Sequence, residues 1–404
     1  MMNPLMWSAL QHPGFRWLFL SNLVSLVGSK IHRIALLFVA YQETQNAVWI
    51  SLILGAQFLA SAVLGPLLGP LADRYDRRTL MIVSNLVRAL LVACIPLFAI
   101  GSMPLLMVIA FLLAAFESVH YAASNSVIPE MVPESVLDGA NGLMVFVNRF
   151  ADVAFVALAG VLVANVGPVP AFWIDAASYL IAAGLLLLLP PLPGKAGKGG
   201  YFAAVAAGIR PLWQNPILRR TIGTLALAAA FGSVESALGI VYAVGALKIG
   251  VQGFGVLEAL MAGGAILGLW VAMPLIKQWS RESVFLFSLA VWGLAFASLG
   301  LFPNVIWAGV ATFLMGVLNT MFIVPARSII QLAAPAELRG RIMAAFGATM
   351  QSAVLVGTFL AGVLEPWLGV LTVLVACGSA VFLAVFTVFL LGGIPRQPSE
   401  AKPS

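Results

Sequence analysis

Charged side chains are few in this sequence of 404 residues, and several of them lie inside long apolar runs. Lys30 and Arg33 are three residues apart, a spacing that places both on one face of a helix. Arg149 and Asp152 have the same spacing. A charge at the centre of a bilayer costs at least about 2.5 kcal/mol, so such residues line a cavity or pair with a partner. These four side chains are therefore candidates for binding a substrate or carrying a proton.

Three acids and a histidine in other apolar runs have the chemistry of proton carriers. Glu117 and His120 lie one helical turn apart, and Glu235 and Glu258 lie in later runs. Removal from water favours the protonated form of a carboxylic acid, and imidazole exchanges protons near neutral pH. We expect Glu117, with His120 as a relay, to take a proton on one side and release it on the other. Glu235 and Glu258 are alternative carriers by the same logic.

Simpler structural explanations exist for the cationic residues. Lys30 and Arg33 either form a positively lined cavity for an anionic substrate or only neutralise buried acids such as Glu117. Arg149 and Asp152 can form an ion pair within one helix, which would make Asp152 a poor proton carrier.

The remaining ionisable residues of the apolar runs include His32, Arg88 and Asp175. Asp175 lies near the outer end of its run, and we expect it to fix a helix end. The two cysteines, Cys94 and Cys377, stand alone without metal-binding spacing. Nucleotide-binding loops and catalytic triads are not visible, so the sequence predicts neither an enzyme nor a metal or cofactor site.

The composition is that of a membrane protein: 62% of the residues are hydrophobic and 9% are charged. Water-soluble domains carry roughly a quarter charged residues, because their surface faces water. A water-soluble protein is therefore excluded, and a lipid bilayer is the expected surrounding. The net charge of +6 is spread over loops, which gives no support for nucleic-acid binding.

Apolar runs long enough to cross a bilayer, about 20 residues each, recur along the chain. Each must be helical, because a backbone in lipid has to satisfy its own hydrogen bonds. The sequence therefore predicts an all-α membrane protein. We place twelve spans near 15–41, 47–71, 79–100, 104–127, 141–165, 171–189, 220–243, 253–276, 283–302, 305–326, 343–364 and 370–392.

Alternate loops between these runs carry most of the lysines and arginines, an asymmetry that marks the cytoplasmic side. We therefore expect a multi-pass protein of the inner membrane with both termini in the cytoplasm. The basic residues of this set are Arg74, Arg77, Arg78, Lys195, Lys198, Arg210, Arg219, Arg220, Lys277, Arg281, Arg339, Arg341, Arg396 and Lys402.

A proline- and glycine-rich stretch follows the sixth run and divides the chain in two. We expect an N-terminal six-helix bundle in residues 1–189, a cytoplasmic linker in 190–218, and a C-terminal six-helix bundle with a short tail in 219–404. At an offset of 202 residues Ser126 aligns with Ser328, so the halves look duplicated. Paired six-helix repeats are a standard plan for transporters, with the substrate site between them.

Residues 69–78, GPLADRYDRR, resemble the loop motif between the second and third helices of the major facilitator superfamily. Further stretches resemble that superfamily's bacterial drug and siderophore exporters, the branch with enterobactin exporters and drug:H+ antiporters. They are 84–89 (SNLVRA), 128–133 (IPEMVP), 174–179 (IDAASY) and 208–216 (GIRPLWQNP).

The resemblance implies a gate formed by the loop motif. In the family, the aspartate that corresponds to Asp73 joins helix-end and arginine contacts that lock the cytoplasmic side. Gly69 would allow close helix contact, and Arg74, Arg77 or Arg78 would supply the cation. The alternative is that these arginines only set the topology.

The resemblance also implies the major facilitator fold and a function. We expect a proton-coupled exporter of amphipathic organic molecules, a multidrug-efflux antiporter that works by alternating access as a monomer. Where this branch often has an aspartate after the first-helix glycine, the chain has Ser29 and Lys30. That departure favours the alternative of an anionic siderophore or lipid-like substrate. A transport-inactive sensor or partner subunit is the other alternative.

Overall fold

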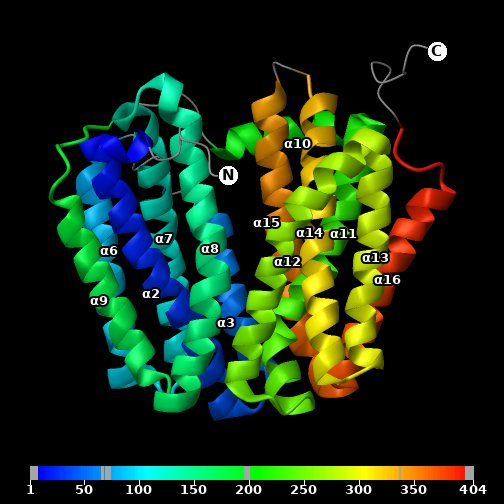
Figure 1. The fold of residues 1–404 in the computed structure, drawn as a ribbon, viewed down its shortest axis with the longest axis horizontal. Coiled ribbons are helices and arrows are strands. Elements are labelled where there is room, and N and C mark those ends of the chain that lie inside the picture. The colour runs from blue at the N-terminus through cyan, green and yellow to red at the C-terminus, as the bar shows by residue number, and fades with distance from the viewer. Residues whose placement is uncertain (1–7, 65–67, 69–73, 195–200, 336–337, 396–404) are drawn as a thin grey trace. The chain divides into compact units, whose positions relative to one another are not determined.

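The computed structural model describes residues 8–64, 68, 74–194, 201–335 and 338–395, and these residues form helices with short connections and no strand (Figure 1). From residue 8 to 194 the elements are the 3₁₀ turn η1 (Ala9–Gln11), α2 (Pro13–Thr44), α3 (Ala47–Leu59), the π-helical turn η2 (Ala60–Leu64), α6 (Arg77–Cys94), the π-helical turn η3 (Ile95–Ala99), α7 (Met103–Met131), α8 (Glu134–Val166) and α9 (Val169–Leu186). From residue 201 to 395 they are α10 (Tyr201–Gln214), α11 (Pro216–Ile240), the π-helical turn η4 (Val241–Ala246), α12 (Gly250–Gln278), α13 (Arg281–Leu301), α14 (Val305–Ala333), α15 (Arg339–Leu368) and α16 (Val370–Leu390).

Twelve helical segments in the described part of the chain are long and apolar enough to cross a membrane, as the sequence predicted. Several helices extend beyond the limits of the spans predicted from the sequence. The fourth span continues to Met131 and the fifth already begins at Glu134, so only two residues separate α7 from α8. Within the expected linker, Tyr201–Gln214 forms α10, which contacts α11 and α15.

The helices begin and end where the local chemistry provides caps. Asn304 accepts hydrogen bonds from the first backbone N–H groups of α14, and Asn215 does the same for α11. These N–H groups have no partner inside the helix, so a side-chain acceptor stabilises the helix start. Gly167 ends α8 at φ 81°, a conformation that glycine adopts without strain. Gly167 and Asn304 both lie in gaps between the spans predicted from the sequence.

The chain divides into two compact units. Unit 1 comprises Met1–Gln45, Leu52–Lys198 and Gly250–Ala259. Unit 2 comprises Asn46–Ser51, Gly199–Ile249 and Leu260–Ser404. The chain therefore changes unit within α3 and again within α12.

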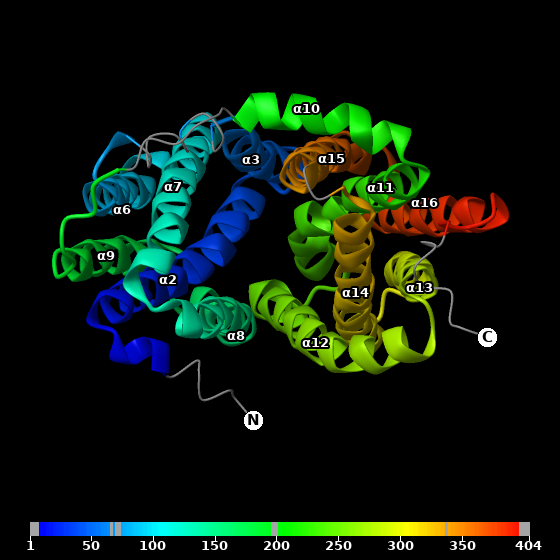
Figure 2. The same cartoon turned by 90° about the horizontal axis from the view of Figure 1, so that it is seen from above.

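Within each unit, the helices pack against one another through buried side chains. In unit 1, α9 packs against α2 and α6, α7 against α6, and α8 against α2 (Figure 2). Large apolar side chains such as Phe15, Met81 and Leu186 fill the space between them. In unit 2, α13 packs against α14 and α16, and α11 packs against α15. The neighbours of α2 in unit 1 are the helices that carry most of the ionisable candidates.

Candidate functional site

Lys30 of α2 and Asp152 of α8 form a close ion pair in unit 1. The Lys30 Nζ lies 2.5 Å from Asp152 Oδ1, and the side chains are 20% and 25% exposed. Arg149 lies one turn away on α8, with Nη1 3.9 Å from the second Asp152 oxygen. The expected Arg149–Asp152 pair is therefore confirmed, but Lys30 holds the carboxylate more closely. One acid is thus placed between two cations.

This geometry predicts unequal coupling energies. We expect a double-mutant cycle of Lys30→Ala and Asp152→Ala, measured by chemical unfolding in mixed micelles, to give about 1–3 kcal/mol. The matched cycle of Arg149→Ala and Asp152→Ala should give less than about 0.5 kcal/mol, because Arg149 is largely exposed. Equal energies in the two cycles would contradict the assignment of Lys30 as the main partner.

Arg33 of α2 pairs with a different acid. Its Nη2 lies 3.4 Å from Oε2 of Glu258, on the part of α12 that belongs to unit 1. The cations of α2 therefore neutralise Asp152 and Glu258, and the suggestion of Glu117 as their partner is wrong. Sequence spacing identified the charged face of α2, whereas the partners come from helices far along the chain.

The expectation that Glu117 is buried is also wrong. Glu117 is exposed on α7, whereas His120 is 7% exposed. His120 Nε2 lies 2.9 Å from Asn22 Oδ1 on α2, so this imidazole is fixed against α2. Hydropathy places a residue within a span but does not reveal which neighbouring side chains cover it. Glu235, the other candidate, is partly buried in α11 of unit 2.

Among the described residues of unit 1, the acid with a buried side chain is Asp175, which the sequence predicted at a helix end. Its side chain is fully buried within α9, and Oδ2 lies 3.4 Å from His32 Nδ1 on α2. Gly28 lets the two helices meet here, since a Cβ at Gly28 would lie 2.6 Å from Asp175 Oδ1 and 2.1 Å from Ser178 Oγ. Asp175 therefore belongs to a helix contact and does not cap α9.

Arg88 and Tyr179 complete this cluster and were missed as site residues. The Arg88 guanidinium lies 4.3 Å from the centre of the Tyr179 ring, and it donates a hydrogen bond to Asn85. The Tyr179 hydroxyl lies 2.9 Å from the Ser29 hydroxyl on α2. The signal was present in the sequence, because the SNLVRA and IDAASY stretches supply Asn85, Arg88 and Tyr179. The structure brings these two stretches together across α6 and α9.

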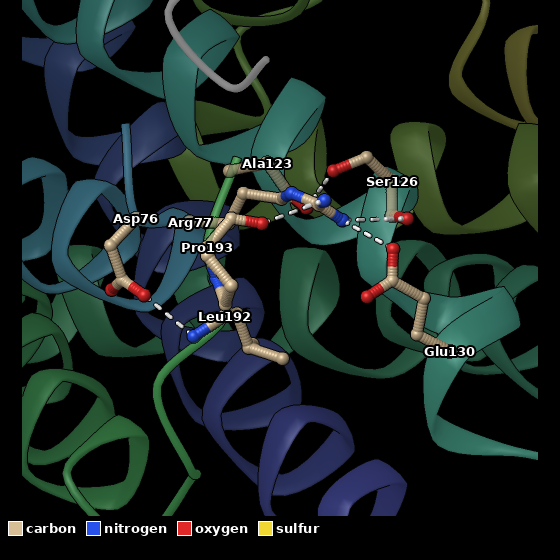
Figure 3. Close-up of polar contacts among 7 residues, drawn as sticks. All are labelled: Asp76, Arg77, Ala123, Ser126, Glu130, Leu192 and Pro193. Carbon is tan, nitrogen blue, oxygen red and sulfur yellow. Dashed lines mark hydrogen bonds and ion pairs between the residues drawn. The ribbon is translucent and has the colours of Figure 1, made fainter. Parts of the chain in front are cut away.

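The described part of the loop motif forms a second polar cluster, at the start of α6 (Figure 3). Arg77 is 3% exposed, and its Nη1 donates to Glu130 Oε1 at 2.8 Å. The same guanidinium donates to the carbonyl oxygens of Ser126 and Pro193. Its backbone N–H donates to the carbonyl of Leu192 at 2.8 Å. Arg77 therefore ties α6 to the last turns of α7 and to the segment after α9.

Arg78 and Asp76 hold that same segment. Arg78 donates to the carbonyl oxygens of Leu186 and Leu187, which the end of α9 leaves without intrahelical partners. Arg74 is exposed. Gly69 and Asp73, the other expected gate residues, lie outside the described residues.

Asp76 is a further polar residue of the motif, and it was not predicted as a site residue. Its Oδ1 accepts from the Thr79 N–H and its Oδ2 accepts from the Leu192 N–H. Burial opposes ionisation of this carboxyl, but its hydrogen bonds and the charge of Arg78 outweigh burial and hold the pKa of Asp76 below its ordinary value. An aspartate three residues before a threonine at a helix start is an N-cap signal. It could have been recognised from the sequence.

Comparison with known proteins decides the family. The family model of the Major Facilitator Superfamily matches residues 18–273, more than half of the chain. The chain belongs to the Major Facilitator Superfamily. The multidrug efflux pump Tap of Mycolicibacterium fortuitum is 25% identical over 91% of this chain and 91% of its own length. Macrolide efflux protein A of Streptococcus pyogenes is 29% identical over 37% of each chain.

Comparison with solved structures shows that a known transporter has the same fold. A crystal structure of the nucleoside transporter NupG superposes with a TM-score of 0.77 at 12% identity, covering 93% of this chain and 99% of NupG. The predicted twelve-helix major facilitator fold is thereby confirmed. The chain is a multi-pass membrane transporter related to efflux pumps.

Proposed function

We propose that this transporter is a proton-driven exporter of amphipathic organic molecules, built to alternate access across the cytoplasmic membrane of a bacterium. The carrying observation is that acids of unit 1 are held inside apolar helices next to cations: Asp152 by Lys30 at 2.5 Å and Glu258 by Arg33 at 3.4 Å. An acid within a span is neutralised either by such a cation or by a bound proton, which is the exchange that proton coupling needs. The names of the efflux relatives support export as the direction and drug-like molecules as the class.

The mechanism needs the proton and the substrate to exclude one another. With an acid ionised, the transporter would bind substrate from the cytoplasm. With the acid protonated after the protein opens outward, the substrate would leave. A ligand shifts such an equilibrium only by its differential affinity for the two states. One charge that crosses 100 mV supplies about 2.3 kcal/mol, enough for a gradient of roughly 40-fold.

The Arg77 cluster is proposed as part of the cytoplasmic gate, with both chain termini on that side. Arg77 connects α6 with α7 and with the segment after α9, so these three segments would move together as a rigid body. The sequence expectation for Asp73 as the central acid of this gate remains a proposal. We further propose that the transporter works as a monomer.

An anionic substrate is the second candidate. Arg149 is 61% exposed and Arg33 is 41% exposed, so both guanidinium groups keep surface available for a carboxylate or phosphate. Arginine binds such groups through two parallel hydrogen bonds. An anionic siderophore or a lipid-like anion would suit this arrangement.

Accumulation in cells tests the proposal. We expect a pump-deficient bacterium that expresses the chain to accumulate less ethidium or labelled erythromycin than the same host with an empty vector. A protonophore should restore the accumulation, and Glu43→Gln, which changes an exposed acid at the end of α2, should behave like wild type.

Reduced accumulation of a labelled catecholate siderophore, with unchanged accumulation of ethidium and erythromycin, would select the anionic alternative. Equal accumulation with and without the chain for all three compounds would contradict the exporter proposal. A transport-inactive sensor would then be the better description.

A further inference from the structure

The contact of Asp175 with His32 differs from the ion pairs of Lys30 and Arg33 because both of its side chains are buried. Asp175 is 0% exposed and the His32 side chain is 9% exposed. The Oδ2–Nδ1 distance of 3.4 Å is longer than the 2.7–2.9 Å that is typical of a charge-assisted hydrogen bond. The carboxylate and the imidazole therefore face each other without forming a short hydrogen bond.

Several polar atoms of this pair have no hydrogen bond. Asp175 Oδ2 and both ring nitrogens of His32 find no partner among the residues that the structure describes. Buried polar groups are normally satisfied, and an orphaned group calls for an explanation such as a bound proton or a functional role. One proton on Asp175 Oδ2, donated to His32 Nδ1, would satisfy two of these atoms at once.

Charged groups on two neighbouring helices act on the Asp175 carboxyl in opposite directions. From α6, the charge of Arg88 acts on Asp175, although the guanidinium itself stacks on Tyr179 and bonds to Asn85. From α7, the charge of Glu117 also acts on Asp175.

The other titratable groups near the pair are already engaged. His120 of α7 is bound through Nε2 to Asn22, and Asp152 of α8 is held by Lys30. The cation of Arg88 therefore compensates an ionised Asp175 through space without locking it in a permanent salt bridge.

The pair also lies where a change of charge can be transmitted. Gly28 brings α2 into direct contact with Asp175, and Ser29 contacts Tyr179 of α9 at 2.9 Å. On α2, Lys30 lies two residues before His32 and Arg33 directly follows it, and the ion pairs of these two cations reach α8 and α12. A shift of α2 at this contact would therefore move the residues proposed to line the substrate path.

We propose that Asp175 and His32 together form the binding site for the transported proton, with Arg88 as the residue that positions and partly compensates the carboxylate. The proton is bound at Asp175 Oδ2 and shared with His32 Nδ1, and it leaves to water when the unit opens to the opposite side. This assignment rests on the proposed function of proton-driven export. It makes Asp175 the main proton carrier in place of Glu117, Asp152 and Glu258, and it leaves Asp152 and Glu258 as acids paired with the cations of α2.

Infrared spectroscopy tests the binding site without any transported compound. Purified wild type in lipid should show the carbonyl stretching band of a protonated carboxylic acid that disappears on alkaline titration. Asp175→Asn should lack this band, and the exposed-acid control Glu43→Gln should keep it. If the band persists in Asp175→Asn, or is lost in Asp152→Asn instead, the assignment is overturned.

A second variant covers the case in which Asp175→Asn does not fold. His32→Gln removes the partner but keeps an uncharged polar side chain, so the titration midpoint of the band should move by about one pH unit or more. An unchanged midpoint would overturn the shared site.

Transport assays separate this proposal from the proposed function. With labelled erythromycin, we expect Asp175→Asn to lose pH-driven accumulation by about tenfold or more while its counterflow, which needs no net proton movement, stays within about twofold of wild type. Retained pH-driven accumulation in Asp175→Asn would overturn the site. If wild type itself shows no proton-driven transport while the band is lost in Asp175→Asn, export coupling fails and Asp175 is left as a proton-binding residue outside any transport cycle.

Discussion

Replacement of Arg77 by alanine is expected to lower the free energy of unfolding by about 3 kcal/mol, the low end of the range for breaking a buried ion pair. The guanidinium is 4% exposed and bonds to Glu130 Oε1 and to the carbonyls of Ser126 and Pro193. The low end applies because Glu130 is 31% exposed and can regain water. Chemical unfolding in mixed micelles measures the loss.

Two matched variants show whether geometry or charge is responsible. Arg77→Lys keeps the positive charge but not the planar fork that reaches several acceptors, so an intermediate loss is expected. Arg74→Ala removes an exposed arginine three residues earlier and should change the unfolding free energy by less than about 0.5 kcal/mol. Equal losses for Arg74→Ala and Arg77→Ala would show that the cluster in Figure 3 contributes little to stability.

Replacement of Gly28 by alanine should cost about 2 kcal/mol of stability, because overfilling a well-packed contact forces side chains and backbone to move. The new Cβ would lie 2.1 Å from Ser178 Oγ, 2.8 Å from Ser178 Cβ and 2.6 Å from Asp175 Oδ1. Rotation of the Ser178 hydroxyl cannot relieve the contact with its Cβ. The helices α2 and α9 must therefore separate, which also pulls Asp175 from His32, and pH-driven transport should fall with the stability.

Gly184→Ala on α9 is the matched control. A Cβ at Gly184 meets nothing within 4 Å, so the substitution should be neutral or stabilise the helix by up to about 1 kcal/mol. The double variant Gly28→Ala with Ser178→Gly should recover part of the loss, since it removes the colliding side chain. No difference between Gly28→Ala and Gly184→Ala in the same unfolding assay would exclude a close contact of α2 with α9.

The membrane-spanning helices were predictable because lipid offers no hydrogen-bond partners to the backbone. Every backbone group of a span must bond within its helix, so apolar runs of sufficient length give twelve helices without knowledge of tertiary contacts. Glycine and asparagine at Gly167 and Asn304 marked connections by local chemistry alone. The ends of α7 and α8 were less predictable, because helices continue past the apolar core where hydropathy gives no signal.

The candidate site was predictable in its residue types and only partly in its partners. Arg149 and Asp152 were paired correctly because the contact lies within one helix. Lys30 finds its acid 122 positions away, and residue spacing within the sequence does not reveal which helices become neighbours. Asp175 was assigned to a helix end from its position in the run, whereas its environment is set by Gly28 and His32 on another helix.

Uptake into liposomes is the most direct test of proton-driven export. Purified protein is reconstituted with an acidic lumen, the membrane potential is clamped with valinomycin and potassium, and ethidium, erythromycin and a catecholate siderophore are offered at the outer face after their binding has been measured. We expect at least one bound compound to accumulate up to about tenfold per pH unit for each exchanged proton, while the lumen becomes more alkaline. Bound compounds that reach the same level with and without the gradient would contradict proton coupling and leave an uncoupled carrier or a sensor.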